Sequence, residues 1–184
     1  MSKASDVQRL FEETKKAFGK IDVLVNNAGV YEFAPIGDFT EEQFRRMFDT
    51  NVLGVLLASR EASKYFGEGG AIINIGSVVT QLTPPASAVY AGTKAAVDAI
   101  TRVLAKELGP KRIRVNSINP GMVETEGVHA AGIIGSDFQK QAEAQTPLGR
   151  IGQPEDIAPL AVFLASQDSG WLTGELVTAA GGMR

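Results

Sequence analysis

The chain has 184 residues, 44% of them hydrophobic and 21% charged, so it is long enough for one domain with a substantial core and too short for two. A net charge of −3 without a basic patch argues against nucleic-acid binding, and zero cysteines with a single histidine exclude disulfides and argue against a metal site. The chain has no signal-peptide pattern and no apolar run near the roughly 20 residues of a membrane span, so we expect a cytoplasmic protein without a membrane partner.

The first predicted elements are a helix and a short strand. The stretch "SDVQ" at Ser5–Gln8 resembles a capping box, the helix that follows reads to about Phe18, and Gly19 provides a stop. The next stretch, "IDVLV" at 21–25, is continuously aliphatic rather than alternating. Such a run is typical of a strand that is buried on both faces of a parallel sheet.

The same pattern of helix and strand then repeats along the chain. A second capping box, "TEEQ" at Thr40–Gln43, opens a long predicted helix that runs to about Phe66. The other predicted elements are strands at 71–76, 113–118 and 174–180 and helices at 88–108 and from about Pro154 onward. Strands that alternate with helices predict a single α/β domain over residues 1–184, with a parallel sheet covered by helices on both faces.

Small and polar residues follow three of the predicted strands. They are "NNAG" at 26–29, "SVVT" beginning at Ser77, and "NPGMVET" at 119–125. Because ligands bind beyond the carboxyl ends of the strands in such sheets, these segments are expected to form the site. The asparagines of "NNAG" could instead be turn residues that tolerate left-handed geometry.

A tyrosine and a lysine lie one turn apart in the predicted helix "SAVYAGTKAAVDAI". Tyr90 and Lys94 are separated by four residues, so both project from one face of the helix. Two unit charges about 6 Å apart interact by roughly 3 kcal/mol at an effective dielectric of about 20, so the ammonium would lower the phenol pKa by about two units. This pair indicates general acid–base catalysis, although a surface cation lying over a half-buried ring would give the same spacing.

Two further polar residues are candidates for the same site. Ser77 ends a strand in the same layer and could hydrogen-bond a substrate oxygen, or it could cap a turn. Asn51 is an amide among apolar neighbours in a helix, where it needs a partner, and it could also be a core amide bonded to a backbone carbonyl. His129 is expected in a solvent-exposed loop without a functional role.

Taken together, these segments resemble the short-chain dehydrogenase/reductase family over nearly the whole chain. The resemblance is carried by "NNAG", Asn51, Ser77, "YAGTK" and "NPGMVET", in this order, and by "LTGELV" near the end. It implies a Rossmann-like three-layer α/β sandwich. It also implies an oxidoreductase that interconverts a small-molecule ketone and alcohol with NAD or NADP.

The resemblance assigns a role to each of four residues. Tyr90 would exchange a proton with the substrate oxygen, Lys94 would lower the pKa of Tyr90 and bind the nicotinamide ribose, Ser77 would fix the substrate oxygen, and Asn51 would hold a water. The cofactor-binding residues that it implies are Asn26, Ala28, Gly29, Tyr90, Lys94, Pro120, Gly121 and Thr125. The segment 128–145 corresponds to a mobile substrate loop.

The sequence departs from the family pattern at its N-terminal side. It has no glycine-rich T-G-x-x-x-G-x-G turn, and it begins with what resembles the helix before the fourth strand, so the first strands of the doubly wound fold are expected to be missing. The strand at 21–25 would then be an apolar edge, which predicts a homo-oligomer. A truncated oxidoreductase, an inactive scaffold protein derived from one, and a fold completed by a separate polypeptide are the alternatives.

Overall fold

The centre of the molecule is a parallel sheet. Over residues 1–67 and 69–183, which the computed structural model describes, it has four strands in the order β1-β2-β3-β4. They are β1 (Val23–Asn26), β2 (Gly70–Ile75), β3 (Ile113–Pro120) and β4 (Leu176–Ala179). The four predicted strands are confirmed to within two residues at each end, and all neighbouring pairs are parallel, as the sequence predicts.

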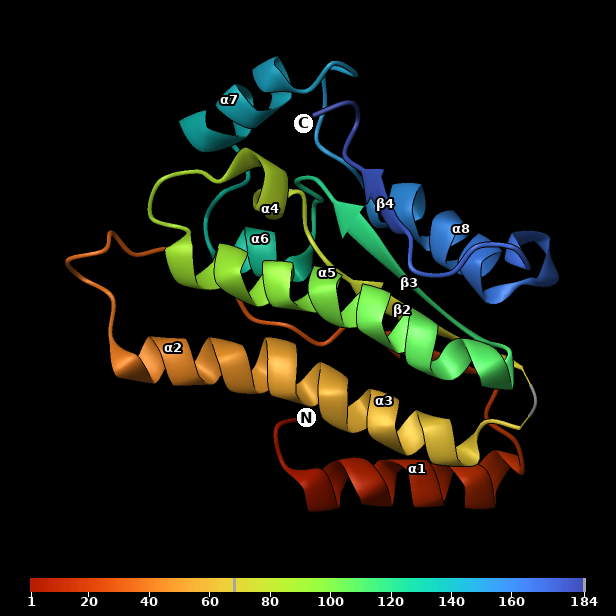
Figure 1. Ribbon diagram of the computed structural model, residues 1–184. Helices are drawn as coiled ribbons and strands as arrows, with labels where there is room; N and C mark the ends of the chain where they lie inside the picture. The colour runs from red at the N-terminus through yellow and green to blue at the C-terminus, as the bar shows by residue number, and fades with distance from the viewer. Residues whose placement is uncertain (68, 184) are drawn as a thin grey trace.

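Helices cover both faces of this sheet. The helices are α1 (Ala4–Phe18), α2 (Glu41–Phe48), α3 (Gly54–Tyr65), α4 (Val79–Leu82), α5 (Ala88–Leu108), α6 (Glu126–Ala130), α7 (Asp137–Gln145) and α8 (Pro154–Ala165). Helices α1, α3 and α5 lie on one side of the sheet and α8 lies on the other (Figure 1). The predicted three-layer α/β sandwich is confirmed. None of the helices in the described part of the chain is both long and apolar enough to cross a membrane.

Two apolar clusters fill the space between the layers. Ile72 of β2 packs with Phe11 and Val115 in the cluster under α1 and α3, whereas its neighbour Ile73 packs with Leu164 in the cluster under α8. Successive side chains of a strand point to opposite faces. The continuous aliphatic strands of the sequence therefore supply both cores at once.

The long helix predicted from Thr40 to about Phe66 is present, with one irregularity. The predicted capping box is confirmed, because Gln43 N donates to Thr40 Oγ1 over 3.2 Å and Thr40 N donates to Gln43 Oε1 over 3.0 Å. Between α2 and α3 lies a π-helical turn, Asp49–Leu53, which contains Asn51. A π turn adds a residue to the helical repeat, so the side chains after it are rotated relative to those before it.

The predicted capping box at Ser5 is wrong. Helix α1 begins at Ala4, with Lys3 in an extended conformation as its N-cap and no side-chain cap. The Lys3 carbonyl accepts hydrogen bonds from the backbone N–H groups of Asp6 and Val7 over 3.2 and 3.1 Å. Burial of the apolar stripe of α1 fixes where the helix lies, and this outweighs the roughly 1 kcal/mol that a side-chain cap contributes.

A row of buried polar side chains crosses the sheet. Asn26, Asn74 and Ser117 are paired in register on β1, β2 and β3. Asn26 Nδ2 donates to Asn74 Oδ1 over 2.9 Å, Asn74 Nδ2 donates to Thr101 Oγ1 of α5 over 2.8 Å, and Ser117 Oγ donates to the Asn74 carbonyl over 3.3 Å. We call these residues, Asn26, Asn74, Thr101 and Ser117, the polar row. Each group in it has a partner, which removes the cost of burying it.

Strand β1 forms one edge of the sheet, as predicted. The expectation that this strand is buried on both faces is wrong, because the side chains of Val23 and Val25 are 39% and 45% exposed. Helix α8 packs mainly on β2 and β3 rather than on β1. An apolar edge strand offers unpaired backbone groups to another chain.

Candidate active site

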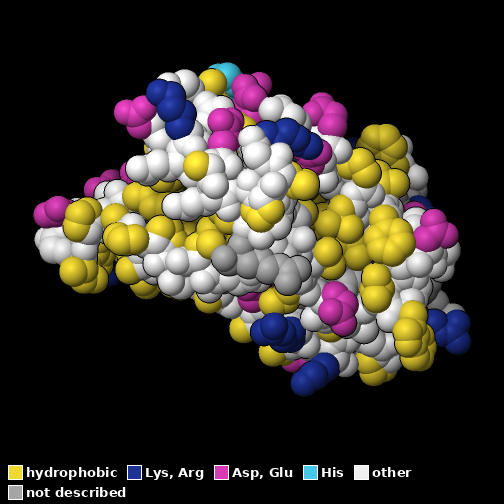
Figure 2. Space-filling model, turned by 90° about the horizontal axis from the view of Figure 1, so that it is seen from above, with side chains coloured by type: hydrophobic (Ala, Val, Ile, Leu, Met, Phe, Trp, Pro, Cys, Tyr) yellow, Lys and Arg dark blue, Asp and Glu magenta, His cyan; other side chains and the backbone are white. Residues whose placement is uncertain are grey.

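The three segments expected to form the site do lie together. Because the strands are parallel, β1, β2 and β3 end at the same edge of the sheet, at Asn26, Ile75 and Pro120. In Figure 1 this is the end toward which the β3 arrow points, and α4, α6 and α7 lie there. Seen from above the view of Figure 1, hydrophobic side chains reach the surface in several places between charged ones (Figure 2).

Tyr90 lies near the start of α5 and is hydrogen-bonded to Ser77. Burial raises the pKa of Tyr90, the hydrogen bond with Ser77 opposes this rise, and the neighbouring Tyr31 adds to it. Ser77 Oγ also accepts from the Val79 N–H at the start of α4 over 3.1 Å, so this serine caps a turn and contacts the tyrosine at once. The pKa of Tyr90 therefore shifts in the direction opposite to the sequence expectation, because desolvation of the phenol outweighs the hydrogen bond with Ser77.

Lys94 is buried beside this pair. Its Nζ donates to the Ile75 carbonyl at the end of β2 over 2.7 Å and lies 5.9 Å from the centre of the Tyr90 ring. The residue is 8% exposed. Burial lowers the pKa of Lys94 to about 8, and the charge of Asp98 opposes this effect. Lys94 therefore changes its charge close to neutral pH.

Asn51 joins the site through its amide. Its Oδ1 accepts from the Val30 N–H and its Nδ2 donates to the Val30 carbonyl, both over 2.8 Å. Nδ2 also donates to Thr93 Oγ1 over 3.1 Å, and that hydroxyl donates to the Tyr90 carbonyl over 2.7 Å. The amide thus holds the loop after β1 against the helix that carries Tyr90.

The cofactor-side residues after β1 differ in where they point. The Asn26 side chain is turned into the core, where it contributes to the polar row and contacts Ser59. Ala28 and Gly29 are exposed. A methyl group added to Gly29 would lie 3.4 Å from Asn51 Oδ1 and 3.8 Å from Lys94 Nζ, so the open space at Gly29 borders directly on the site.

The cofactor-side residues after β3 are held by their backbone neighbours. The Pro120 carbonyl accepts from the Val78 N–H over 2.9 Å, which joins the ends of β2 and β3. Gly121 fits closely against β4, because an added Cβ would lie 2.9 Å from the Cβ of Ala180. Thr125 is the N-cap of α6 and its Oγ1 accepts from the Val128 N–H over 3.4 Å. These bonds fix the loop, and they leave Thr125 itself exposed.

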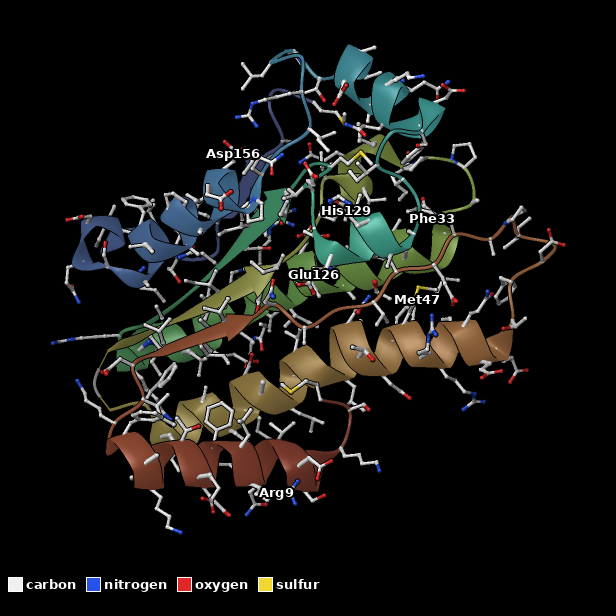
Figure 3. The ribbon with its side chains drawn as sticks, turned by 180° about the vertical axis from the view of Figure 1, so that it is seen from behind. Arg9, Phe33, Met47, Glu126, His129 and Asp156 are labelled. Atoms are coloured by element: carbon white, nitrogen blue, oxygen red, sulfur yellow. The ribbon has the colours of Figure 1, made fainter. Side chains whose placement is uncertain are left out.

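Sequence reasoning missed an aromatic cluster next to Tyr90. The ring centre of Tyr90 lies 6.1 Å from that of Tyr31 and 5.9 Å from that of Phe33, which is 49% exposed. Figure 3 shows Phe33 and His129 at the same end of the molecule. His129 is exposed, as expected, but it lies in α6 and pairs with Glu124 over 2.8 Å. Aromatic residues at alternate positions directly after "NNAG" were the available signal.

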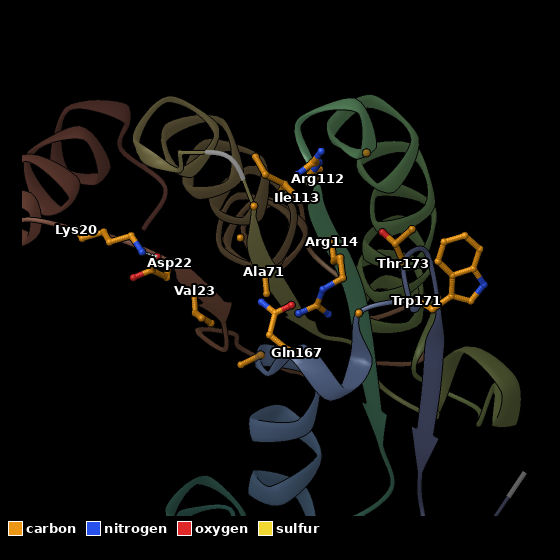
Figure 4. Close-up of a pocket in the computed structure, with 15 residues that line it drawn as sticks. Lys20, Asp22, Val23, Ala71, Arg112, Ile113, Arg114, Gln167, Trp171 and Thr173 are labelled. Atoms are coloured by element: carbon orange, nitrogen blue, oxygen red, sulfur yellow. Dashed lines mark ion pairs between the residues drawn. The ribbon is translucent and has the colours of Figure 1, made fainter.

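Two cavities of the described chain lie away from Tyr90 and Lys94. A cavity of about 730 Å³ opens at the amino ends of the strands, opposite the site, and Arg114, Gln167 and Trp171 line it (Figure 4). A second cavity of about 480 Å³ lies between Met122 and residues 178–182. The side chains of the predicted tetrad, which consists of Asn51, Ser77, Tyr90 and Lys94, line neither of these two cavities.

Replacing Lys94 by methionine tests its buried charge. In the folded chain the pKa is about 8 against an ordinary 10.5, so the unfolded chain binds more protons between these values and stability rises with pH there. As the pH rises through this window, the free energy of unfolding of the native chain should increase by about 3 kcal/mol relative to that of the Lys94→Met variant. Denaturant titrations of both chains at several pH values measure this difference. Lys106→Met, at an exposed position of α5, is the control and should give none.

Comparisons with known proteins agree with this geometry. Residues 1–184 match a family described as enoyl-(acyl carrier protein) reductase. The chain is 59% identical to an uncharacterized oxidoreductase of Methylorubrum extorquens, covering 100% of this chain and 74% of that protein. It is 38% identical to tetrahydroxynaphthalene reductase of Pyricularia oryzae, covering 96% of this chain and 66% of the reductase.

Solved structures are similar over the same extent. A mutant of a Serratia marcescens short-chain dehydrogenase/reductase superimposes with a TM-score of 0.92 at 34% identity, covering 99% of this chain and 73% of that one. A blue fluorescent protein from a metagenomic library, solved in complex with NADPH, superimposes with a TM-score of 0.91 at 31% identity, covering 99% of this chain and 72% of that one.

Proposed function

The chain belongs to the short-chain dehydrogenase/reductase family, and from this premise we propose that it interconverts a small-molecule ketone and its alcohol with NAD(P)H. The observation that carries the proposal is the hydrogen bond between Tyr90 and Ser77 with the Lys94 ammonium beside them. A similar protein with NADPH bound, and relatives named as reductases, support the direction of reduction.

In reduction, Tyr90 is the proton donor. Its raised pKa keeps the phenol protonated at neutral pH, so it can donate to a ketone oxygen as negative charge develops there. When a ketone is bound, the Ser77 hydroxyl turns its single proton from the phenol to the ketone oxygen and so orients that oxygen toward Tyr90. In oxidation the phenolate takes the proton back, so the rate of alcohol oxidation rises with pH.

The residues around Lys94 fit the nicotinamide side of a cofactor. An ammonium has three donors, and one of them is used by the Ile75 carbonyl, so the others are available to ribose hydroxyls. Next to Lys94, Gly29 leaves a space that a Cβ would fill. A bound NAD(P)H supplies the hydride, and the chain supplies position and electrostatics. The loop that carries Gly29 is joined to α5 by the hydrogen bonds of Asn51.

Cofactor binding is the first test. We expect NADPH, or NADH, titrated into the chain to give a saturable rise in nicotinamide fluorescence at micromolar concentration. Filling the space at Gly29 by Gly29→Leu should weaken this binding at least tenfold, whereas Gly37→Leu, at a glycine in open surroundings, should leave it unchanged. Absence of binding up to millimolar cofactor would overturn the proposal.

A further inference from the structure

A buried carboxyl group lies next to the site. Asp98 lies one helical turn after Lys94 on α5 and is 8% exposed. Its Oδ1 accepts from Asn119 Nδ2 over 3.0 Å. Burial raises the pKa of Asp98, and hydrogen bonds from Asn119 and Thr80 and the charges of Arg102 and Lys94 oppose the rise. The Asp98 carboxyl is therefore held in place by several polar and charged neighbours.

Its partner Asn119 lies at the end of β3, directly before Pro120. It is 1% exposed, and its Oδ1 accepts from Ser117 Oγ of the polar row over 2.8 Å. The amide fills the space beside Gly76, where an added Cβ would overlap its oxygen and come within 2.8 Å of its Cγ. Asn119 is therefore fixed on both sides, and so is the carboxylate that it holds.

We propose that Asp98 and Asn119 are positioning residues for the proposed reaction, whose hydrogen bond ties α5 to the end of β3 and keeps the Lys94 ammonium oriented and charged. The inference rests on the proposed function. Asp98 fulfils this positioning role without contact to the substrate.

The arrangement around Lys94 supports this role. The Ile75 carbonyl, which is neutral, holds Nζ from β2, and the Tyr90 ring lies on the same helix. Asp98 is the charged group that acts on Lys94, and the Asn51 amide facing it across Gly29 from the π turn is uncharged. Arg102, also on α5, faces Asp98. The ammonium therefore depends on Asp98 for its compensating charge.

Three elements of the site meet at Asp98. Helix α5 carries Tyr90 and Lys94, and β3 ends with Asn119 and Pro120. Thr80 belongs to α4, which Ser77 caps. A displacement of Asp98 would shift the elements that carry the tetrad. Loss of its charge alone would instead lower the pKa of Lys94.

The substitution Asp98→Asn separates these two effects. The amide keeps the shape and an oxygen that accepts from Asn119 and Thr80, but it removes the charge. We expect the Lys94 titration midpoint, followed by NMR of ¹³C-labelled lysine and assigned with Lys94→Met, to fall by about one pH unit. Asp98→Glu should restore most of the shift, and Glu107→Gln, at an exposed position of the same helix, should leave the midpoint unchanged.

The outcomes distinguish this inference from the proposed function. The NMR titration needs neither cofactor nor substrate, so an unchanged Lys94 midpoint in folded Asp98→Asn overturns the positioning role even if NADPH binds. A lowered midpoint without NADPH binding overturns the proposed function instead. If Asp98→Asn does not fold, the smaller uncharged Asp98→Ser takes its place with the same expected shift. In the active chain, the pH above which ketone reduction declines should fall by the same amount.

Discussion

Replacement of Tyr90 by phenylalanine is expected to lower the rate of ketone reduction about 10³-fold, the usual contribution of a positioned general acid. The variant loses the hydroxyl that bonds Ser77 and keeps the ring that packs against Tyr31 and Phe33. The fold and the nicotinamide-side contacts of Lys94 should therefore survive. Steady-state rates with NADPH and a panel of ketones, together with the fluorescence titration of NADPH, measure the two effects separately.

The control is the same chemical change elsewhere. Tyr65 lies on α3, with its ring 5.7 Å from that of Phe11, and it is remote from the tetrad. Tyr65→Phe should reduce ketones at the native rate. Equal rates for native chain and Tyr90→Phe, with NADPH still bound, would show that the proton comes from another group.

Substitution of Gly76 by alanine is expected to destabilise the fold by about 3 kcal/mol. The new Cβ would overlap the amide oxygen of Asn119 and lie 2.9 Å from Ser117 Oγ. Both side chains are fully buried, so neither can move away without breaking the hydrogen bonds that hold Asp98 and the polar row. Chemical denaturation followed by circular dichroism measures the loss.

Gly92 of α5 provides a matched glycine. An alanine there would meet only the Phe48 ring, at 3.9 Å, and helical alanine is favoured over glycine by roughly 0.5–1 kcal/mol. Gly92→Ala should therefore be neutral or slightly stabilising. If Gly76→Ala were as stable as Gly92→Ala, the close packing of Asn119 under Gly76 would not be a constraint on the fold.

The positions of strands and helices could be predicted because local signals are strong in this chain. The aliphatic residues 71–73 mark a buried strand directly, and the capping box at Thr40 marks a helix start. The meeting of "NNAG", Ser77 and Pro120 followed from one topological fact, since parallel strands end at the same edge. At Ser5 the local signal failed, because packing of the helix face overrode the cap.

Other features depend on groups that are distant in the sequence. Asn51 in the π turn at Asp49–Leu53 forms hydrogen bonds with the Val30 backbone, and no local sequence pattern marks this turn. The direction in which the pKa of Tyr90 shifts depends on how deeply the fold buries the phenol. The four-residue spacing of Tyr90 and Lys94 does not reveal this burial. The relation of Asp98 to Lys94 has the same four-residue spacing as that of Lys94 to Tyr90, but its partner Asn119 is brought to it only by the fold.

The polar row has a consequence for how the sheet assembles. A slip by one residue exchanges the two faces of a strand, and β2, which is aliphatic toward both cores, would still bury apolar side chains on each face. A slip would separate Asn26 from Asn74 and Asn74 from Ser117, and each buried group left unsatisfied would cost about 1–3 kcal/mol. The row therefore favours the alignment of β1, β2 and β3 that brings the strand ends of the site together.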